Sequence, residues 1–179
     1  KFLKEGSLYR GFKPVLWSTV EKTALADAEV EYQDHKSDTI YTAFPVKKTN
    51  IKELENTEVI IWTTTPWTLP SNLAAAVNAE FDYVKIKDEE KDRVYIIAEC
   101  RLKDTLKQAN IKKHKVLEKF KGKELVGKQY VPLFNYFEEM KEQKCFTVIA
   151  GKFVTKDAGT GVVHCAPGFG EEDFKACLE

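Results

Sequence analysis

Two short segments hold side chains that could bind a polar, partly charged ligand. Residues 62–72, Trp-Thr-Thr-Thr-Pro-Trp-Thr-Leu-Pro-Ser-Asn, bring hydroxyls, two indoles and two prolines into one stretch. Neither a core strand nor a surface helix needs that density, so the segment predicts a binding site. Residues 159–174 place His164 and Asp173 on either side of a Gly/Pro turn, which can bring both side chains to one end of the structure.

Three consecutive threonines, Thr63, Thr64 and Thr65, end a predicted strand whose Val59 and Ile61 can anchor a core. Hydroxyls both donate and accept hydrogen bonds, so this cluster can bind sugar oxygens and a base edge, or hold a water molecule. Threonine is also common in strands for reasons of packing alone. Three in a row followed by Pro66 make strand propensity the poorer explanation.

A nucleophile is harder to find. Cys165 follows His164 in a predicted strand, where neighbouring side chains point to opposite faces, and this disfavours a Cys–His pair. A lone His is more often structural than catalytic. The serines lack the context of a nucleophile elbow, so no Ser-His-Asp set can be argued.

Asp173 and Asn72 each have a structural and a functional interpretation. Asp173 lies in the first turn of a predicted helix over 171–179, where an acid stabilises the helix dipole without any ligand, and Glu171 and Glu172 are expected to do only that. Asn72 could cap a predicted Ala-rich helix over 72–77 or take part in catalysis.

The elements that must position these residues are mainly β. Val, Ile, Thr and aromatic content predicts strands over 39–44, 59–64, 83–86, 94–98, 147–150 and 161–164. Helices are expected over 23–28, 72–77, 101–109 and 171–179. This pattern predicts a compact β-barrel with helices on its outside.

Length and composition fit one domain over residues 1–179, with 43% hydrophobic and 31% charged residues. No apolar run approaches the roughly 20 residues that cross a bilayer, which excludes a membrane protein of the helical kind. The chain starts at Lys1 rather than Met and stops inside a predicted helix, so we expect it to be part of a longer protein.

Cysteines and charges add two expectations. The four cysteines are widely spaced without a Cys-x-x-Cys pair, which argues against zinc and a disulfide framework and favours reduced thiols in the cytosol. The net charge is zero, yet residues 101–130 carry ten basic against three acidic side chains. That stretch could attract a polyanion through its phosphates or be a solvated face.

Together, the two segments resemble the editing domain of class I isoleucyl-tRNA synthetases. The form Thr-Thr-Thr-Pro-Trp-Thr-Leu-Pro is similar to the isoleucyl branch, whereas valyl and leucyl enzymes typically have Thr-Thr-Arg-Pro. The resemblance extends to residues 6–18 and 23–32. The turn 165–172 is similar to cytosolic eukaryotic enzymes, and eukaryote-like forms occur in some bacteria.

The resemblance implies an α/β, mainly β fold: an antiparallel barrel-like core with peripheral helices, shared by valyl, isoleucyl and leucyl editing domains. In the family this core is inserted into a Rossmann catalytic domain. No Gly-x-Gly-x-x-Gly, P-loop or His-x-Gly-His signature is present. ATP and Mg²⁺ are therefore expected to act in that absent domain, and this chain is expected to need no cofactor or metal.

The implied activity is post-transfer editing, the hydrolysis of valine mischarged onto tRNA(Ile) by a positioned water; misformed valyl-adenylate is a further implied substrate. Valine lacks one methylene of isoleucine, a difference worth only about 1–3 kcal/mol in an apolar pocket, and this enzyme family is the standard example of that limit. The implied partners are the tRNA(Ile) 3′ acceptor end carrying valine and the rest of the parent chain, in the cytoplasm.

The resemblance also implies roles for individual residues. Asp173 binds the substrate ammonium, Thr63, Thr64 and Thr65 hold the terminal adenosine and the ester, and His164 obstructs the extra methyl of isoleucine. Asp173, Thr64 and Asn72 form the expected catalytic set. Trp67 and Thr68 are expected to complete the side-chain pocket, although Trp67 could instead pack beneath Pro70.

Two other functions stay open at this point. One is a catalytically silent module that binds the tRNA acceptor end, and the other is an unrelated metal- or cysteine-dependent hydrolase. Intact Asp173, His164 and the three threonines argue against a pure binding module, which would need the basic stretch and little of the pocket.

Overall fold

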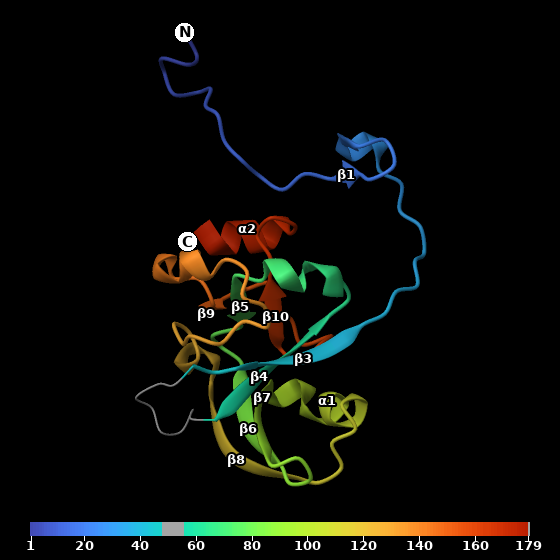
Figure 1. Cartoon of the computed structure of the whole chain (residues 1–179), viewed down its shortest axis with the longest axis vertical. Helices are drawn as coiled ribbons and strands as arrows, with labels where there is room; N and C mark the ends of the chain where they lie inside the picture. Colours follow the sequence, from blue (N-terminus) through green and yellow to red (C-terminus); the bar gives the residue numbers. More distant parts are fainter. Residues whose placement is uncertain (48–55, 179) are drawn as a thin grey trace.

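The structure is a computed structural model that describes residues 1–47 and 56–178 (Figure 1). Its strands are β1 (Trp17–Ser18), β2 (Thr23–Ala24), β3 (Ile40–Pro45), β4 (Thr57–Thr63), β5 (Ala74–Val77), β6 (Asp82–Asp88), β7 (Arg93–Ala98), β8 (His114–Lys121), β9 (Thr147–Ala150) and β10 (Val162–Cys165). The α-helices are α1 (Leu102–Gln108) and α2 (Glu171–Leu178), and the 3₁₀ helices are η1 (Asp27–Glu29), η3 (Pro66–Ser71), η4 (Glu99–Arg101), η5 (Gly122–Glu124) and η6 (Glu138–Gln143).

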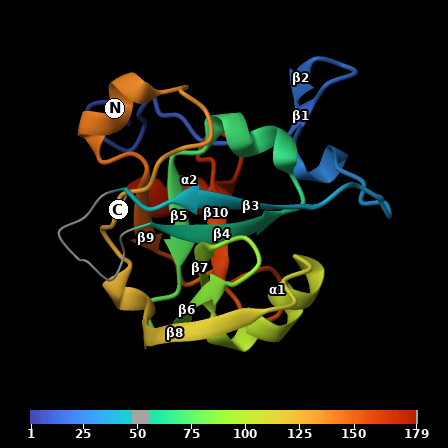
Figure 2. The same cartoon turned by 60° about the horizontal axis from the view of Figure 1, so that its bottom comes forward.

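Two sheets form the body of the molecule. The larger has five strands in the order β3-β4-β7-β6-β8, and the smaller has three in the order β10-β5-β9. The β4/β7 and β5/β9 pairs are parallel, whereas the other pairs in these two sheets are antiparallel. Figure 2 shows strands β3 and β4 of the larger sheet crossing in front of β5 and β10.

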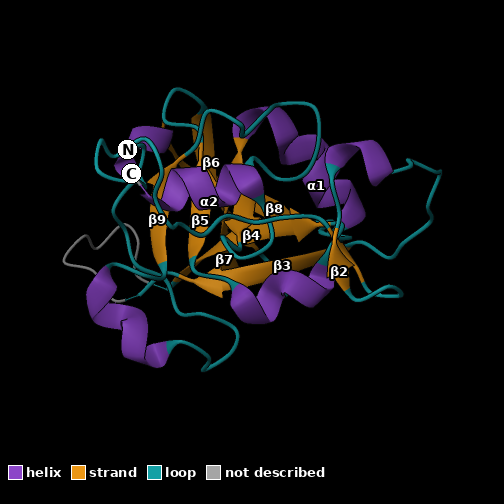
Figure 3. Cartoon of the chain, turned by 90° about the horizontal axis from the view of Figure 1, so that it is seen from above, coloured by secondary structure: helices purple, strands orange, loops and turns teal. Residues whose placement is uncertain are grey.

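The sheets pack face to face between two helices, with α1 on the outer side of the larger sheet and α2 on that of the smaller (Figure 1). Figure 3, seen from above, shows α2 lying over β5. Strand β4 is apolar on both faces: Val59 and Ile61 join the core between the sheets, while Ile60 packs with the residues beneath α1. A strand that is buried on both faces has a continuous run of apolar residues in its sequence, and Val59-Ile60-Ile61 is such a run. The end of β4 is therefore held firmly where the threonines begin.

The predicted strands are all present, and the mainly β fold class is confirmed. Two details of the expected core differ. The sheets are mixed rather than purely antiparallel, and the described strands form two open sheets instead of a closed barrel. Two parallel strands need a long crossover connection. The connection between β4 and β7 includes the strands β5 and β6.

The helix expected over 72–77 is wrong, because residues 74–77 form strand β5. Alanine favours helices by only a few tenths of a kcal/mol per residue, and tertiary context overrides such a preference. Here β5 is the central strand of the smaller sheet and bonds to neighbours on both edges. Its small side chains let the layers approach: Ala75 faces the main core and Ala76 the opposite cluster.

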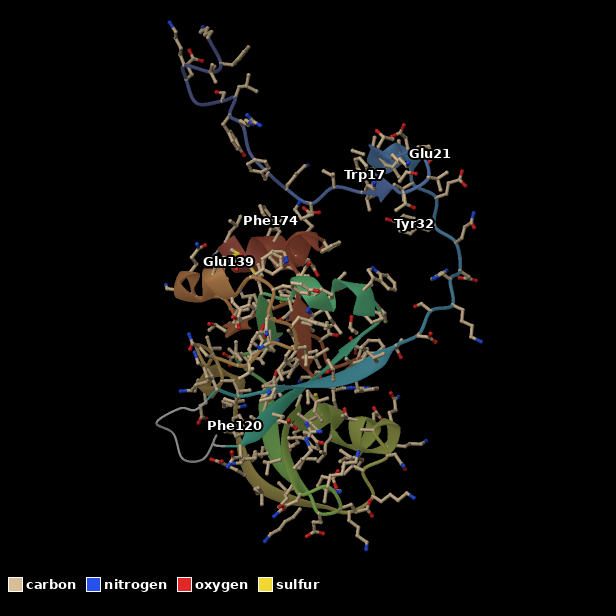
Figure 4. The ribbon with its side chains drawn as sticks, viewed as in Figure 1. Trp17, Glu21, Tyr32, Phe120, Glu139 and Phe174 are labelled. Carbon is tan, nitrogen blue, oxygen red and sulfur yellow. The ribbon has the colours of Figure 1, made fainter. Side chains whose placement is uncertain are left out.

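The helix expected over 23–28 is also wrong; these residues form β2 and the start of η1. A helix of one or two turns without an apolar face buried against a core is not stable, because nucleation is unfavourable. The segment belongs to an arm, residues 1–39, that runs outside the two sheets with side chains such as Trp17 and Tyr32 exposed (Figure 4).

The helices expected over 101–109 and 171–179 are present as η4 with α1 and as α2, where residue 179 lies outside the described part. Strand β8 was not predicted. It is the edge strand of the larger sheet and is mostly exposed, so it lacks the apolar alternation that reveals a strand. Within the described residues, no helix is long and apolar enough to cross a membrane.

Candidate functional site

The threonine segment turns sharply where β4 ends. Thr63 is the last residue of β4, and η3 begins two residues later at Pro66, whose fixed φ suits the first position of a helix. The Thr63 hydroxyl accepts a hydrogen bond from the backbone N–H of Thr65 at 3.0 Å, and the two Oγ1 atoms are 3.3 Å apart. The side chains of Thr63 and Thr65 are thus brought together, while Thr64 is exposed at the bend between them.

His164 lies in β10 and is only 7% exposed, with both ring nitrogens in hydrogen bonds. Nε2 is 2.8 Å from Thr68 Oγ1, and Nδ1 is 2.9 Å from Asn72 Nδ2. The Thr68 hydroxyl donates its single hydrogen to the Thr65 carbonyl at 2.8 Å, so toward His164 it can only accept. We therefore assign the hydrogen to Nε2 and the lone pair to Nδ1.

This tautomer leaves His164 neutral with no free nitrogen. Burial lowers the pKa of His164, and the nearby charge of Asp173 opposes this shift to a smaller extent. The Asn72 amide also donates to Nδ1, which disfavours a proton there. A general base needs an accessible lone pair, so the geometry favours a structural or size-selecting role for this ring over proton abstraction.

Asn72 is a junction in the same buried network. Its side chain is 3% exposed, donates to the Ala74 carbonyl at 2.9 Å as well as to His164, and accepts from the Tyr130 hydroxyl at 2.5 Å. Asn72 does not cap a helix over 72–77, which was one of its two alternatives, because β5 follows it. Its backbone N–H instead closes η3 on the Leu69 carbonyl.

Asp173 is held against the turn that follows His164. It sits in the first turn of α2, and its Oδ2 accepts a hydrogen bond from the backbone N–H of Ala166 at 2.8 Å. Gly170 makes room for this carboxylate, since a Cβ there would lie 2.8 Å from Oδ2. Ala166 is two residues beyond His164, which places the carboxylate at the same end of β10 as the imidazole.

The structure connects Thr63, Thr65, Thr68, Asn72 and His164 by hydrogen bonds and places Asp173 beside them. Trp67 is 63% exposed, so it is not a core residue. Tyr130 is the network residue that the sequence did not predict. It lies in a stretch without recognisable motifs, and no spacing relates it to Asn72.

Cys165 offers no nucleophile at this site. Burial raises the pKa of its thiol, with a smaller contribution from Asp173, so the thiolate is disfavoured. Among the described residues, no group of three or more His, Cys, Asp and Glu side chains could hold a metal ion. The chemistry that the site offers comes from hydroxyls, an amide, a neutral imidazole and one carboxylate.

Comparison with known proteins identifies the family. The family model for class I tRNA synthetases (I, L, M and V) matches residues 1–156. The chain belongs to the class I tRNA synthetases. Isoleucine–tRNA ligase from Pelagibacter ubique is 59% identical over 100% of this chain, and the cytoplasmic isoleucine–tRNA ligase of Saccharomyces cerevisiae is 46% identical over 98% of it.

This synthetase chain spans only 20% and 16% of those two relatives. Its fold is similar to the crystal structure of GlLeuRS-CP1, with a TM-score of 0.61 and 18% identity over 77% of this chain and 58% of that one. The Plasmodium falciparum cytosolic leucyl-tRNA synthetase editing domain has a TM-score of 0.50 and 18% identity over 61% of this chain and 41% of that chain. The isoleucyl branch of the resemblance is supported by these isoleucine–tRNA ligase relatives, and the fold is that of the leucyl-tRNA synthetase editing domains.

Proposed function

We propose that this synthetase chain hydrolyses the ester bond of valine mischarged onto tRNA(Ile). The observation that carries the proposal is the buried network in which His164, Thr68 and Asn72 are fixed beside the Asp173 carboxylate, at the end of β4 where the threonine hydroxyls gather. An apolar pocket alone discriminates one methylene by only about 1–3 kcal/mol, so a second, hydrolytic site adds accuracy.

In the proposed complex the substrate ammonium binds the Asp173 carboxylate. One carboxylate oxygen already accepts from Ala166, which fixes the orientation of the group and leaves its other oxygen for the ligand. The exposed Thr64 and the rim hydroxyl of Thr65 bind the terminal adenosine and the ester. Trp67, exposed beside them, forms the outer wall of the amino acid pocket together with Thr68.

The reaction is attack by a water molecule on the ester carbonyl. The acyl–oxygen bond breaks, the water's oxygen ends on valine, and a proton ends on the ribose hydroxyl of the tRNA. An ester on a vicinal diol is already reactive, so positioning supplies much of the acceleration. His164 limits the size of the side chain that can enter, and its two occupied nitrogens keep it out of proton transfer.

The wider setting is part of the same proposal. Because the chain spans about a fifth of its isoleucine–tRNA ligase relatives, the remainder of a parent chain would supply ATP- and Mg²⁺-dependent aminoacylation. Several relatives are named as cytoplasmic ligases, and we place this activity in the cytoplasm on that ground. The editing site itself needs neither cofactor nor metal in this mechanism.

The proposed function is tested by incubating the purified chain with valyl- and isoleucyl-tRNA(Ile) and measuring release of the labelled amino acid. We expect valine to be released faster than isoleucine, with no change on adding a chelator or a thiol reagent. Binding of tRNA without any hydrolysis would instead identify a silent acceptor-end module. Loss of activity with the chelator or the thiol reagent would point to a metal- or cysteine-dependent hydrolase.

The basic stretch supports a separate prediction about tRNA contact. Lys103, Lys107, Lys112, Lys113 and Lys115 are exposed, and within the described part of the chain none of them forms an ion pair. By contrast, Lys119 pairs with Glu99 and Lys121 with Asp82. The five lie on or between α1 and β8, across the larger sheet from η3 and α2 (Figures 1 and 2).

Replacing Lys112 and Lys113 by Gln should weaken tRNA binding and flatten its dependence on salt, because each lost phosphate contact lowers the slope of log K against log salt by about 0.7–0.9. Binding of a small valyl-adenosine analogue should not change, since the pair lies far from the site. The matched control replaces the ion-paired Lys119 and Lys121 by Gln. Equal effects of both double variants on tRNA, or no effect of either, would identify the stretch as a solvated face.

A further inference from the structure

Tyr130 is fixed in the core and bonds to the candidate site through its hydroxyl. Its side chain is 2% exposed, and its ring packs against Phe44 at 4.9 Å and Phe146 at 6.3 Å between centroids. The backbone is held too, because the Tyr130 N–H donates to the Phe146 carbonyl at 3.0 Å. The hydroxyl therefore has little freedom, and it points at Asn72 Oδ1.

Four hydrogen bonds run in one direction from that hydroxyl. Tyr130 donates to Asn72, Asn72 donates to His164, His164 donates to Thr68, and Thr68 donates to the Thr65 carbonyl. In such a chain each bond polarises the next, and one reversed member leaves two donors or two acceptors facing each other. Tyr130 is the first donor of the chain.

The Asn72 amide is the member that could reverse. Its two amide hydrogens now face the Ala74 carbonyl and His164 Nδ1, and its oxygen faces the Tyr130 hydroxyl. In the reversed amide the oxygen would face the Ala74 carbonyl, which disfavours the reversal, and it would need a hydrogen bond from an N–H at Nδ1, which would change the tautomer of His164. Within the described residues, Tyr130 is the only side chain that bonds to Asn72 Oδ1, so it contributes to holding the amide as it is.

We propose that Tyr130 is a positioning residue of the editing site, holding the Asn72 amide in the orientation that fixes the ring and the tautomer of His164. This proposal rests on the proposed function for its effect on substrate choice, but not for its effect on the imidazole. In this proposal Tyr130 does not contact the substrate. A tyrosine serving only the core would leave the state of His164 unaffected when its hydroxyl is removed.

Tyr83 offers a matched control. It is also fully buried, and its hydroxyl bonds only to backbone, donating to the Gly161 carbonyl at 2.6 Å and accepting from the Asn78 N–H at 3.1 Å. Tyr83→Phe therefore removes one buried hydroxyl, as Tyr130→Phe does, without touching Asn72 or His164. General loss of stability is common to both variants, whereas a change at His164 is expected of Tyr130→Phe alone.

The first readout is the nitrogen NMR spectrum of His164 in the 179-residue chain. We expect a proton on Nε2 and none on Nδ1 in the unmodified chain and in Tyr83→Phe. In Tyr130→Phe a fraction with the proton on Nδ1 should appear, and the titration midpoint should rise because the amide no longer opposes protonation there. Asp173, the charged group that acts on His164, is the same in all three.

The second readout is the ratio of valyl- to isoleucyl-tRNA(Ile) deacylation rates. Tyr130→Phe should lose part of the roughly 10–200-fold discrimination available for one methylene, and Tyr83→Phe should keep the ratio of the unmodified chain. Hydrolysis of valyl-tRNA should continue in both.

The two proposals fail separately. If the unmodified chain hydrolyses neither ester, the proposed function fails, while the NMR comparison still decides the role of Tyr130. A proton on Nδ1 in the unmodified chain would overturn the positioning proposal, and this measurement does not depend on any variant folding. Identical His164 spectra in Tyr130→Phe and Tyr83→Phe would overturn it as well.

Discussion

Replacing Asp173 by Asn should reduce hydrolysis of valyl-tRNA(Ile) by roughly 30- to several thousand-fold, the equivalent of about 2–5 kcal/mol for one partner of a hydrogen-bonded ion pair. The variant removes the charge that we propose to bind the substrate ammonium. Its amide oxygen can still accept from the Ala166 N–H, so the turn after β10 should keep its shape. Single-turnover deacylation rates and a thermal melt of the same preparation test both parts.

Asn is a sharper test than Ala at this position. Ala would also leave the Ala166 N–H without its acceptor, a cost of about 1–3 kcal/mol if the group stays buried. That loss exceeds the 0.3–1 kcal/mol or so expected of a first-turn acid alone. An Ala variant could therefore lose activity through the turn rather than through the charge.

Two further variants separate charge from position. Glu172→Gln removes the same charge from an exposed neighbour in the same helical turn and should leave deacylation unchanged. Gly170→Ala keeps the carboxylate but places a Cβ 2.8 Å from Asp173 Oδ2, so it should displace the group and lower the rate. Wild-type hydrolysis by folded Asp173→Asn, or an equal loss in Glu172→Gln, would rule out the ammonium-binding role.

Replacing His164 by Ala should allow the chain to hydrolyse correctly charged isoleucyl-tRNA(Ile) while it keeps appreciable activity on valyl-tRNA(Ile). Removing the ring opens room for one methylene, a change in selectivity of at most about 1–3 kcal/mol. A general base at this position predicts a different result, a loss of roughly 10²–10⁴-fold on both esters with their ratio unchanged. Parallel measurement of the two deacylation rates distinguishes these outcomes.

The His164→Ala variant needs a stability control, because it removes a hydrogen bond to Thr68 Oγ1 and leaves one of the two Asn72 amide hydrogens without an acceptor. An unsatisfied buried donor costs about 1–3 kcal/mol, so the rates should be measured well below the melting temperature. His114→Ala is the matched variant, since His114 is exposed on β8. Loss of both activities in equal proportion by folded His164→Ala would contradict the size-selecting role.

His164→Ala should also change how the free energy of unfolding depends on pH in the acid range. Because burial lowers the pKa of His164, the unfolded chain takes up a proton at a higher pH than the folded chain does. The contribution of His164 to stability is therefore present above the ordinary His pKa of about 6.5 and is lost as the pH falls below it. A thermal melt of His164→Ala should lack this component, whereas His114→Ala should retain it.

Local patterns predicted most of the skeleton. Apolar, β-branched runs such as Val59-Ile60-Ile61 are visible in the sequence because burial on both faces of a strand leaves no other residue type acceptable. The exposed edge strand β8 carries no such constraint, and its lysines show only as a concentration of positive charge. The alanines of β5 predict a helix by propensity, because their small size, which suits a central strand between close layers, gives no strand signal.

The composition of the candidate site is also a property of the sequence. The threonine run, the His and the Asp lie next to turns that their own glycines and prolines specify, so their presence at strand ends could be predicted. Of the contacts in the site, the one between Thr63 and Thr65 is local, because it joins residues two apart in the chain. Family resemblance adds roles, which the variants above test.

What only the tertiary structure decided is the state of His164. Its two nitrogens are bonded by Thr68 and Asn72, 96 and 92 residues earlier in the chain, and Asn72 is in turn bonded by Tyr130, 58 residues later. Side-chain hydrogen bonds need atoms within about 3 Å in a defined direction. No local pattern encodes such a coincidence between distant segments. The sequence alone therefore determined which groups stand at the site, and the packing of two sheets determined that the imidazole is neutral, oriented and fully bonded.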